Sequence, residues 1–559
     1  MSAIRSSDAV NSQRPDVSSG LQGAGTSSPS GAATEQLDVP EPRGGGGAPR
    51  LRFLAEWPLL AVLLVQAALS LRLVRADTAY QSEAAALWSG HLEWAHWLHG
   101  APIPPFPAFF SAAPVLYPPL GAAADSIGGL TGARILSLVF MLAATVLLWG
   151  AAKRLFGRRA AFFAAALFAA LGPTLHLGAF ATYDALSVLL IAAASWCVIR
   201  AAEHGTWGLV AGGAFLALAN ATSYGTVVFD PFVAALALLI AIQACGGLVA
   251  VRRAATLLLV TAALLTAGLL IGGSTYRLGV QHTVLSQVPG SASPQQVFAH
   301  SWYWAGLLVV LAACGIIISV ASRQDAARTW LLVVLTAAVV AGPLNQARLH
   351  TAATLDKHLG LGAWFAAIAA GYAVDRFIAA APAGRSRALT CGACVIALVF
   401  PAALAASQSQ ELSTSWPNAT AFITLFGPLA DRGTGHLLVE DAPIAKYYLP
   451  SGAQWQRWSS TRTINLPSGT STGGPAASAS VTSPGNAAVY ANYIARGYFS
   501  VVALNYTDTT ALDHSITADL RRNHHYRIVQ VIPYGVEVPP IGLGTYVIWR
   551  YQPHPNTAG

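Results

Sequence analysis

The chain has 559 residues, of which 54% are hydrophobic and only 10% charged, and its mean hydropathy is +0.51. Soluble globular proteins carry roughly 25% charged residues, so this composition leaves too little charge to cover a soluble body of this size. A net charge of +8 could suggest a nucleic-acid partner, but the basic residues lie at the ends of apolar runs, where membrane topology explains them better. We therefore expect a polytopic α-helical membrane protein and no nucleic-acid partner.

Residues 1–50 are rich in Ser, Gly, Pro and Ala and show no apolar periodicity. This composition predicts a disordered cytoplasmic tail. The tail is too long and too polar for the n-region of a cleaved signal peptide, so the apolar run from Trp57 is interpreted as a retained signal-anchor helix.

Beyond the tail, about eleven apolar runs are candidates for membrane-spanning helices. Two of them, 206–221 and 329–344, are short for a hydrocarbon core that needs about 20 residues, and either could be re-entrant or tilted. The predicted spans are 57–75, 131–152, 159–178, 183–201, 206–221, 224–246, 254–273, 301–320, 329–344, 358–378 and 388–406.

The basic residues predict the orientation of these spans. Every second loop is basic and the loops between are nearly bare, which places the N-terminus in the cytoplasm and the C-terminal region outside. Arg72 and Arg75, at the outer end of the first span, are exceptions. The loops assigned to the cytoplasm contain Lys153, Arg154, Arg158, Arg159, Arg200, Arg252, Arg253, Arg323, Arg328, Arg376, Arg385 and Arg387. Since Arg greatly outnumbers Lys, which favours a GC-rich genome, we expect a bacterial plasma membrane.

This topology predicts two long outer loops, 77–130 and 274–300, and a soluble outer domain at 407–559. Long loops in a compact body are usually functional. In the soluble region, short apolar runs predict strands at 437–439, 499–504, 526–532 and 545–551, and a helix at 507–522. Together they indicate a small α/β unit, interrupted by a flexible Ser, Thr, Gly and Pro-rich loop at 467–485.

The first outer loop carries most of the chemistry-bearing residues. Asp77, Tyr80 and Glu83 are spaced so that they could share one helix face. The loop later reaches Tyr117, which is followed by Pro118-Pro119-Leu120, and Arg134 lies at the start of the next span.

In these residues the chain resembles the GT-C membrane glycosyltransferases that use lipid-linked sugars. It is most similar to bacterial relatives of dolichyl-phosphate-mannose protein mannosyltransferases and of lipid A aminoarabinose transferases, of glycosyltransferase family 39 type. The resemblance covers 57–406, which it identifies as a GT-C-like catalytic domain within the region 51–406. The motifs that carry it are Asp77, Tyr80, Pro118-Pro119-Leu120, Arg134, the basic run 154–159, Pro173 with Thr182-Tyr183-Asp184 and, in the soluble domain, 439–441 and 446–449.

Two residues depart from the family pattern. Thr78 follows Asp77 where the family usually has Glu, and Tyr117 stands where many members carry a Lys or His that contacts the donor phosphate. The resemblance therefore implies that another cation serves here. The candidates are Arg134, Lys357 and His358.

Each candidate also has a simpler structural interpretation. Asp77 has a carboxylate at the outer boundary of the membrane, where it could accept the proton of the acceptor hydroxyl. It could instead cap a helix or pair with Arg75. Asp184 could be functional or an N-cap. Arg134 could bind phosphate or snorkel, and Lys357 with His358 could bind an anionic donor or anchor the helix at the interface.

A divalent metal site is a further hypothesis. His282 and His300, in the second outer loop, could bind a metal ion together with Glu83, although no fixed ligand spacing supports this. The chain has no P-loop or dinucleotide fingerprint, which fits a lipid-phosphate sugar as donor.

Together these residues predict an inverting transferase that moves a hexose or pentose from a polyprenyl-phosphate donor. The acceptor would be a hydroxyl of a protein, glycan or lipid, Asp77 would be the base, and the substrate-binding residues would be Tyr80, Glu83, Tyr117, Arg134, Asp184, Lys357 and His358. The alternatives are a transporter or lipid flippase, which usually shows repeated halves and charges near mid-span, and a non-catalytic member of the same fold.

Overall fold

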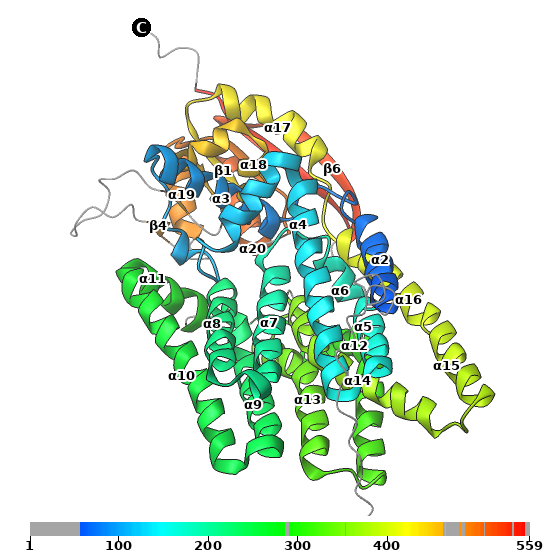
Figure 1. Cartoon of the computed structure of the whole chain (residues 1–559). Helices are drawn as coiled ribbons and strands as arrows, with labels where there is room; N and C mark the ends of the chain where they lie inside the picture. The colour runs from blue at the N-terminus through cyan, green and yellow to red at the C-terminus, as the bar shows by residue number, and fades with distance from the viewer. Residues whose placement is uncertain are drawn as a thin grey trace, which may run out of the picture. The chain divides into compact units, whose positions relative to one another are not determined.

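A computed structural model describes residues 56–285, 290–352, 354–461, 464–465, 480–481, 487–507, 509–538 and 542–553. The predicted tail 1–50 lies outside these residues, as does nearly all of the predicted loop 467–485. Residues Glu56–Gly559 form one compact unit, in which a helical bundle is followed by a sheet with its own helices (Figure 1).

The bundle consists of the apolar helices that the sequence predicts. They are α2 (Trp57–Leu71), α4 (Tyr117–Phe156), α5 (Arg158–Ala169), α6 (Gly172–Leu177), α7 (Tyr183–His204), α8 (Thr206–Thr222), α9 (Asp230–Cys245), α10 (Gly247–Ile271), α12 (Pro294–Ala321), α13 (Ala326–Arg348), α14 (Leu355–Ala380), α15 (Arg385–Ala397) and α16 (Val399–Ser413).

Within the described residues, eight helical segments are long and apolar enough to cross a membrane. The predicted spans outside these eight fall on shorter helices: α2 has 15 residues, α8 has 17, and the span 159–178 is divided between α5 and α6. The predicted short span 329–344 lies within α13, whose 23 residues are sufficient. The chain is a multi-pass membrane protein.

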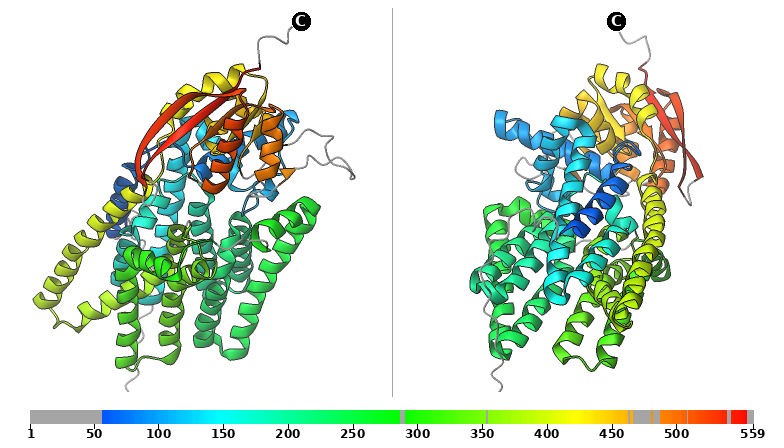
Figure 2. Two further views of the ribbon diagram at one scale, coloured as in Figure 1. Left: turned by 180° about the vertical axis from the view of Figure 1, so that it is seen from behind. Right: turned by 45° about the vertical axis from the view of Figure 1, so that its right-hand side comes forward.

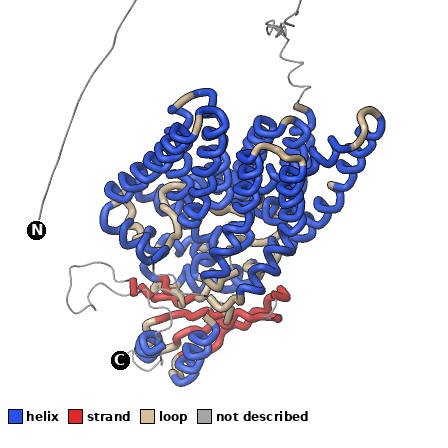
Figure 3. The backbone as a smooth tube through the Cα atoms, turned by 90° about the horizontal axis from the view of Figure 1, so that it is seen from below, coloured by secondary structure: helices blue, strands red, loops and turns tan. Residues whose placement is uncertain are grey.

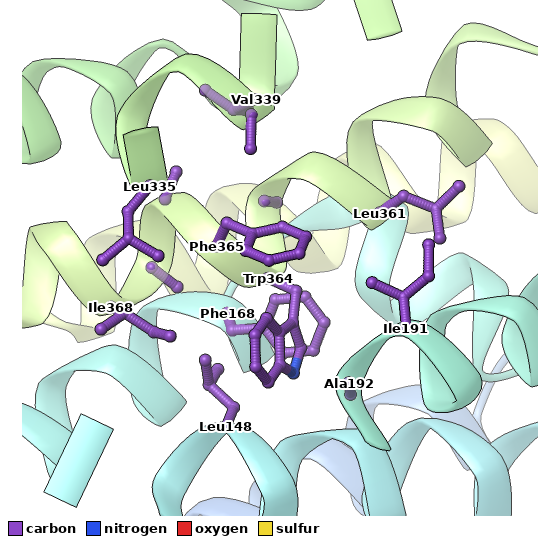
Figure 4. Packing of buried hydrophobic residues seen from close by; sticks show 14 of the residues in the cluster. Leu148, Phe168, Ile191, Ala192, Leu335, Val339, Leu361, Trp364, Phe365 and Ile368 are labelled. Atoms are coloured by element: carbon purple, nitrogen blue, oxygen red, sulfur yellow. The ribbon is translucent and has the colours of Figure 1, made fainter. Parts of the chain in front are cut away.

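Helix α14 is the centre of the bundle. A Cβ added at Gly362 would lie 2.5 Å from the carbonyl oxygen of Ala338 on α13, and one at Gly371 would lie 2.4 Å from that of Ala160 on α5. These glycines let the helix backbones approach closely, as small residues do in membrane bundles. Between them, Trp364 and Phe365 fill the core (Figure 4).

The long segments between spans are ordered where the structure describes them. The first contains α3 (Gln81–His99), η1 (Phe106–Ala108) and the first turns of α4, which is kinked at Gly129. The second contains α11 (Gly273–Val280) and η3 (Gln281–Leu285). Helix α12 begins at Pro294, several residues before the predicted start of that span, because Ser293 and Gln296 form a capping box.

The region after α16 has a five-stranded sheet of order β2-β1-β5-β7-β6, with β1 parallel to β2 and β5, and β7 antiparallel to β5 and β6. The predicted strands and helix are confirmed here, with later or wider bounds at several ends. The elements are α17 (Thr420–Arg432), β1 (His436–Val439), α18 (Ala442–Tyr448), η4 (Pro450–Ala453), η5 (Trp455–Arg457), β2 (Trp458–Ser459), β3 (Ile464–Asn465), β4 (Ser480–Val481), α19 (Ala487–Ala495), β5 (Phe499–Leu504), α20 (Thr510–Arg522), β6 (Tyr526–Val538) and β7 (Gly542–Tyr551).

The sheet lies at one end of the bundle, near α3 (Figures 1 and 2). Seen from below, the strands lie together at one side of the bundle, with further helices on the far side of the strands (Figure 3). One apolar core joins α17 and α18 to one side of the sheet, and another joins α19 and α20 to the strands. No observation tests the predicted boundary between 51–406 and 407–559, so it stays a prediction.

Candidate active site

Asp77 lies in the turn between α2 and α3, and among the described residues only one of its carboxylate oxygens accepts hydrogen bonds. Oδ1 accepts hydrogen bonds from the backbone N–H of Thr78 at 2.6 Å and from the Asn418 side-chain amide at 2.8 Å, with the Thr78 hydroxyl at 3.3 Å. Burial raises the pKa of the Asp77 carboxyl, and the hydrogen bonds from Thr78 and Asn418 oppose that rise. The described residues include no Arg75–Asp77 ion pair.

The prediction that Asp77, Tyr80 and Glu83 share a helix face is wrong. Tyr80 is the N-cap of α3, and its backbone N–H donates to the Glu83 carboxylate at 3.0 Å. This capping box starts the helix after Tyr80 and leaves Asp77 in the preceding turn. Asp77 is therefore not the cap of α3.

Arg134 and Glu83 form a buried ion pair, with side chains 2% and 0% exposed. Nε and Nη2 of Arg134 donate to the two carboxylate oxygens at 2.8 and 2.7 Å. The remaining guanidinium contacts are to backbone carbonyls of Val74, Asp77 and Thr78. This arrangement holds the Asp77 turn, and it gives no support to the predicted contact of Arg134 with a donor phosphate.

Tyr117 is also buried, with 1% of its surface exposed. It begins α4, and its ring packs beside Gly121 one turn later. Within the described part of the chain, its hydroxyl has no hydrogen-bond partner. The geometry gives no support to direct contact between Tyr117 and a substrate.

Four rings form a cluster next to the Asp77 turn, here called the aromatic wall: Tyr80, His176, Phe180 and Trp416. The ring of Trp416 lies 5.2 Å from that of Tyr80 and 5.9 Å from that of Phe180, between ring centres. Its indole N–H donates to the Thr78 carbonyl at 3.0 Å. His176 completes the wall, 4.7 Å from Phe180.

Phe180, in the aromatic wall, also contacts a second charged pair, formed by Lys357 and Asp184. The Lys357 ammonium lies 5.1 Å from the Phe180 ring centre and 2.9 Å from the Asp184 carboxylate, which also accepts from Thr182 at 2.7 Å. Next to it, Nδ1 of His358 lies 3.0 Å from the Gln346 amide. The structure thus brings Asp184 next to Lys357 and His358, which lie far from it in the sequence.

These three residues line a polar cavity of about 480 Å³. Its other polar walls include Tyr224, Asn345 and Arg348, the last being exposed and donating to Asn345 at 3.0 Å. Asp77 is not among the lining residues. A series of contacts runs from the Asp77 turn through Trp416 and Phe180 to Lys357 at the cavity. Lys357 gives this cavity an ammonium group, a kind of side chain that commonly binds phosphate.

Comparison with known proteins places this arrangement in context. The family model of dolichyl-phosphate-mannose-protein mannosyltransferases matches residues 126–271, less than half of the chain, and no curated protein matches. ArnT from Cupriavidus metallidurans, crystallised with undecaprenyl phosphate, is 12% identical, with a TM-score of 0.56 over 88% of this chain and 98% of that one. The chain has the GT-C fold.

A second solved structure agrees. The oligosaccharyltransferase of Archaeoglobus fulgidus in its apo form is 13% identical, with a TM-score of 0.51 over 83% of this chain and 71% of that one. At these identities the likeness concerns the fold, including the helical bundle and the predicted GT-C-like arrangement.

Sequence reasoning missed the residues by which the segment after α16 holds the Asp77 turn of this GT-C fold. Asn418 and Trp416 contact that turn directly, and the Ala419 backbone N–H donates to the Thr78 hydroxyl at 2.9 Å. The Tyr448 hydroxyl accepts from the Ala79 N–H at 2.8 Å. Thr78, a departure from the family pattern, therefore binds this segment through both its hydroxyl and its backbone carbonyl. No sequence signal joins positions more than 330 residues apart.

The structure offers no support for a metal site. Among the described residues, no group of three His, Cys, Asp or Glu side chains is placed to hold an ion. Glu83, one of the predicted ligands with His282 and His300, is bound to Arg134. The metal hypothesis stays a prediction, and chelation during an activity assay tests it.

Proposed function

We propose that this GT-C protein transfers a sugar from a polyprenyl-phosphate donor to an acceptor hydroxyl at the outer face of the bacterial plasma membrane. The transfer inverts the configuration at C1, and Asp77 is the base. The sugar is a hexose or pentose, and the acceptor belongs to a protein, glycan or lipid.

The observation that carries the proposal is the state of the Asp77 carboxylate. Its described hydrogen bonds all reach Oδ1, from Thr78 and Asn418, so Oδ2 keeps its lone pairs. A fixed carboxylate with one free oxygen suits proton transfer, which requires a base held within hydrogen-bond reach of the reacting hydroxyl. The raised pKa makes this carboxylate a stronger base than an exposed Asp.

The reaction balances without another reactant. The acceptor oxygen attacks C1 from the face opposite the phosphate, and the bond between C1 and the phosphate oxygen breaks with its electron pair on that oxygen. The acceptor proton passes to Oδ2 of Asp77. The products are a glycoside of inverted configuration and polyprenyl phosphate.

The cavity beside Lys357 supports a site for the donor phosphate. Lys357 has three N–H donors, and Asp184 takes one, which leaves others for phosphate oxygens. His358 and Arg348 line the same cavity. The bound undecaprenyl phosphate of the structurally similar ArnT is consistent with this class of donor. In this scheme Asp184 positions Lys357, and Arg134 with Glu83 positions the Asp77 turn.

The test is sugar transfer by the purified full chain in nanodiscs. Radiolabelled mannosyl, glucosyl and arabinosyl polyprenyl phosphates are offered with glycan, peptide and lipid acceptors, and both products are quantified. Transfer is expected with the wild type and lost with Asp77→Ala. Asp519→Asn, a carboxylate change on α20, is the matched control and leaves transfer unchanged.

The same assay separates the alternative functions. Transfer that survives Asp77→Ala at the wild-type rate contradicts the role of Asp77. Movement of the labelled lipid between leaflets without product identifies a flippase, and neither reaction with any donor identifies a non-catalytic member.

A further inference from the structure

A second, smaller cavity lies between α3, the η1 segment and the region around α18. Its volume is about 150 Å³. Its walls are largely aromatic, and one basic residue, Lys446, lines it. The aromatic lining residues are Trp88, Phe106, Phe109, Phe110, Trp455 and Trp458.

The indole N–H groups around this cavity are held by backbone carbonyls. Trp88 donates to Gly452 at 3.0 Å, Trp455 to Pro102 at 3.0 Å and Trp458 to Ser451 at 2.9 Å. These bonds fix the rings before any ligand arrives, which lowers the entropic cost of binding. The aromatic walls are therefore preorganised.

Lys446 is the unusual member of the cavity. Its ammonium lies 4.6 Å from the centre of the Trp88 ring, and within the described part of the chain it has no hydrogen-bond or ion-pair partner. Burial lowers its pKa to about 8, so it is still mainly protonated at neutral pH. By surface exposure Lys446 is half-buried, and the space beside its ammonium is the cavity rather than a counter-charge from the described residues.

We propose that this cavity binds one sugar ring that carries a carboxylate or a phosphate. The C–H face of a sugar ring is apolar and fits against aromatic walls, while the anionic substituent pairs with Lys446. The volume is below the range of drug-sized ligand pockets, about 300–1,000 Å³, and suits a single ring better than a peptide or an isoprenoid chain.

The position of the cavity gives the ring a role. Trp88 and Ala85 lie on α3, the helix that begins directly after the Asp77 turn, and Lys446 lies on α18, which packs on α3. We infer that the bound ring is an acidic sugar of the acceptor, and this role rests on the proposed function. The inference that the cavity binds such a ring does not depend on the proposed function.

The test is saturation-transfer NMR on the full chain in phosphatidylcholine nanodiscs. The probes are methyl β-glucuronide, mannose 6-phosphate and neutral methyl β-glucoside. At least one anionic probe is expected to bind about tenfold more tightly than the neutral one, the effect of a single hydrogen bond to a charged group. The two anionic probes show which charge the site prefers. Equal affinity for all three, or no binding, overturns the proposal.

Variants assign the binding to this cavity. Lys446→Met keeps the aliphatic stem and is expected to reduce the anionic probe to the affinity of the neutral one, whereas Lys153→Met, a lysine change near the end of α4, has no effect. Thermal midpoints show whether each variant is folded, and if Lys446→Met is not, the wild-type comparison decides. Asp77→Asn is expected to keep full probe affinity, so failure of transfer and failure of this site are distinguishable.

Discussion

The two charged pairs near the Asp77 turn differ in what surrounds them. Glu83 and Arg134 are completely enclosed, and the guanidinium contacts are all to protein acceptors. Asp184 and Lys357 are of similar charge, but they line a cavity of about 480 Å³. A cation near a candidate site is available to a ligand only if its hydrogen-bond donors are not already used by the protein. The enclosed pair stabilises the Asp77 turn, and the open pair faces the cavity in which we propose that the donor phosphate binds.

The largest expected effect comes from breaking the enclosed pair. Arg134→Met leaves the buried Glu83 carboxylate without a counter-charge and is expected to lower the free energy of unfolding by about 3–5 kcal/mol. Denaturant titration of the protein in detergent micelles measures it. The double variant Glu83→Gln with Arg134→Met removes both charges and is expected to recover part of the loss. An unchanged free energy of unfolding in Arg134→Met would show that the enclosed pair does not stabilise the fold, which contradicts the distinction drawn between the two pairs.

A smaller effect is expected at the open pair, and on binding rather than stability. Lys357→Met combined with Asp184→Asn removes both charges and is expected to weaken binding of polyprenyl phosphate by roughly 10- to 100-fold, since hydrogen bonds to charged groups contribute about 1.5–3 kcal/mol. Equilibrium dialysis with short-chain polyprenyl phosphate measures the dissociation constant. An affinity equal to that of the wild type would show that the donor phosphate does not bind in this cavity.

The smallest effect is expected at the contact between the Asp77 turn and the segment after α16. Asn418→Ala removes one hydrogen bond to the ionised Asp77 carboxylate, which raises its pKa further. Because the base must be ionised, the acidic limb of the rate profile moves to higher pH, and the rate on that limb falls by about fivefold, equivalent to ~1 kcal/mol. A pH–rate profile checks this, with Asn345→Ala in the cavity as a control that leaves the limb in place. A limb that moves to lower pH would be incompatible with Asp77 acting as the base.

The sequence predicted the parts of this molecule that depend on local patterns. Long apolar runs predicted the spans, and short apolar runs predicted β1, β5, β6 and β7. The α3 helix was expected, but its start was not, because the capping box of Tyr80 with Glu83 is a side-chain choice that spacing alone does not distinguish from a continued helix.

The site itself was only partly predictable. Asp77, Lys357 and Asp184 were expected near one face of the membrane, yet their partners depend on packing between distant segments. Arg134 was assigned to a phosphate because a lone arginine shows only its charge; its enclosure by Glu83, 51 residues away, appears only in three dimensions. Asn418 and Lys446 lie in a region whose chain path over α3 no periodicity predicts.

The most direct test measures whether Asp77 acts in the chemical step of transfer rather than in binding of the donor. Single-turnover transfer is measured with saturating donor in the wild type and in Asp77→Asn, which keeps the shape of the side chain, and polyprenyl-phosphate affinity is measured in both. If Asp77 is the base, the rate constant of Asp77→Asn is expected to be lower by about 10²- to 10⁴-fold, the range of general-base catalysis, with affinity unchanged. A rate constant within twofold of the wild type would contradict it.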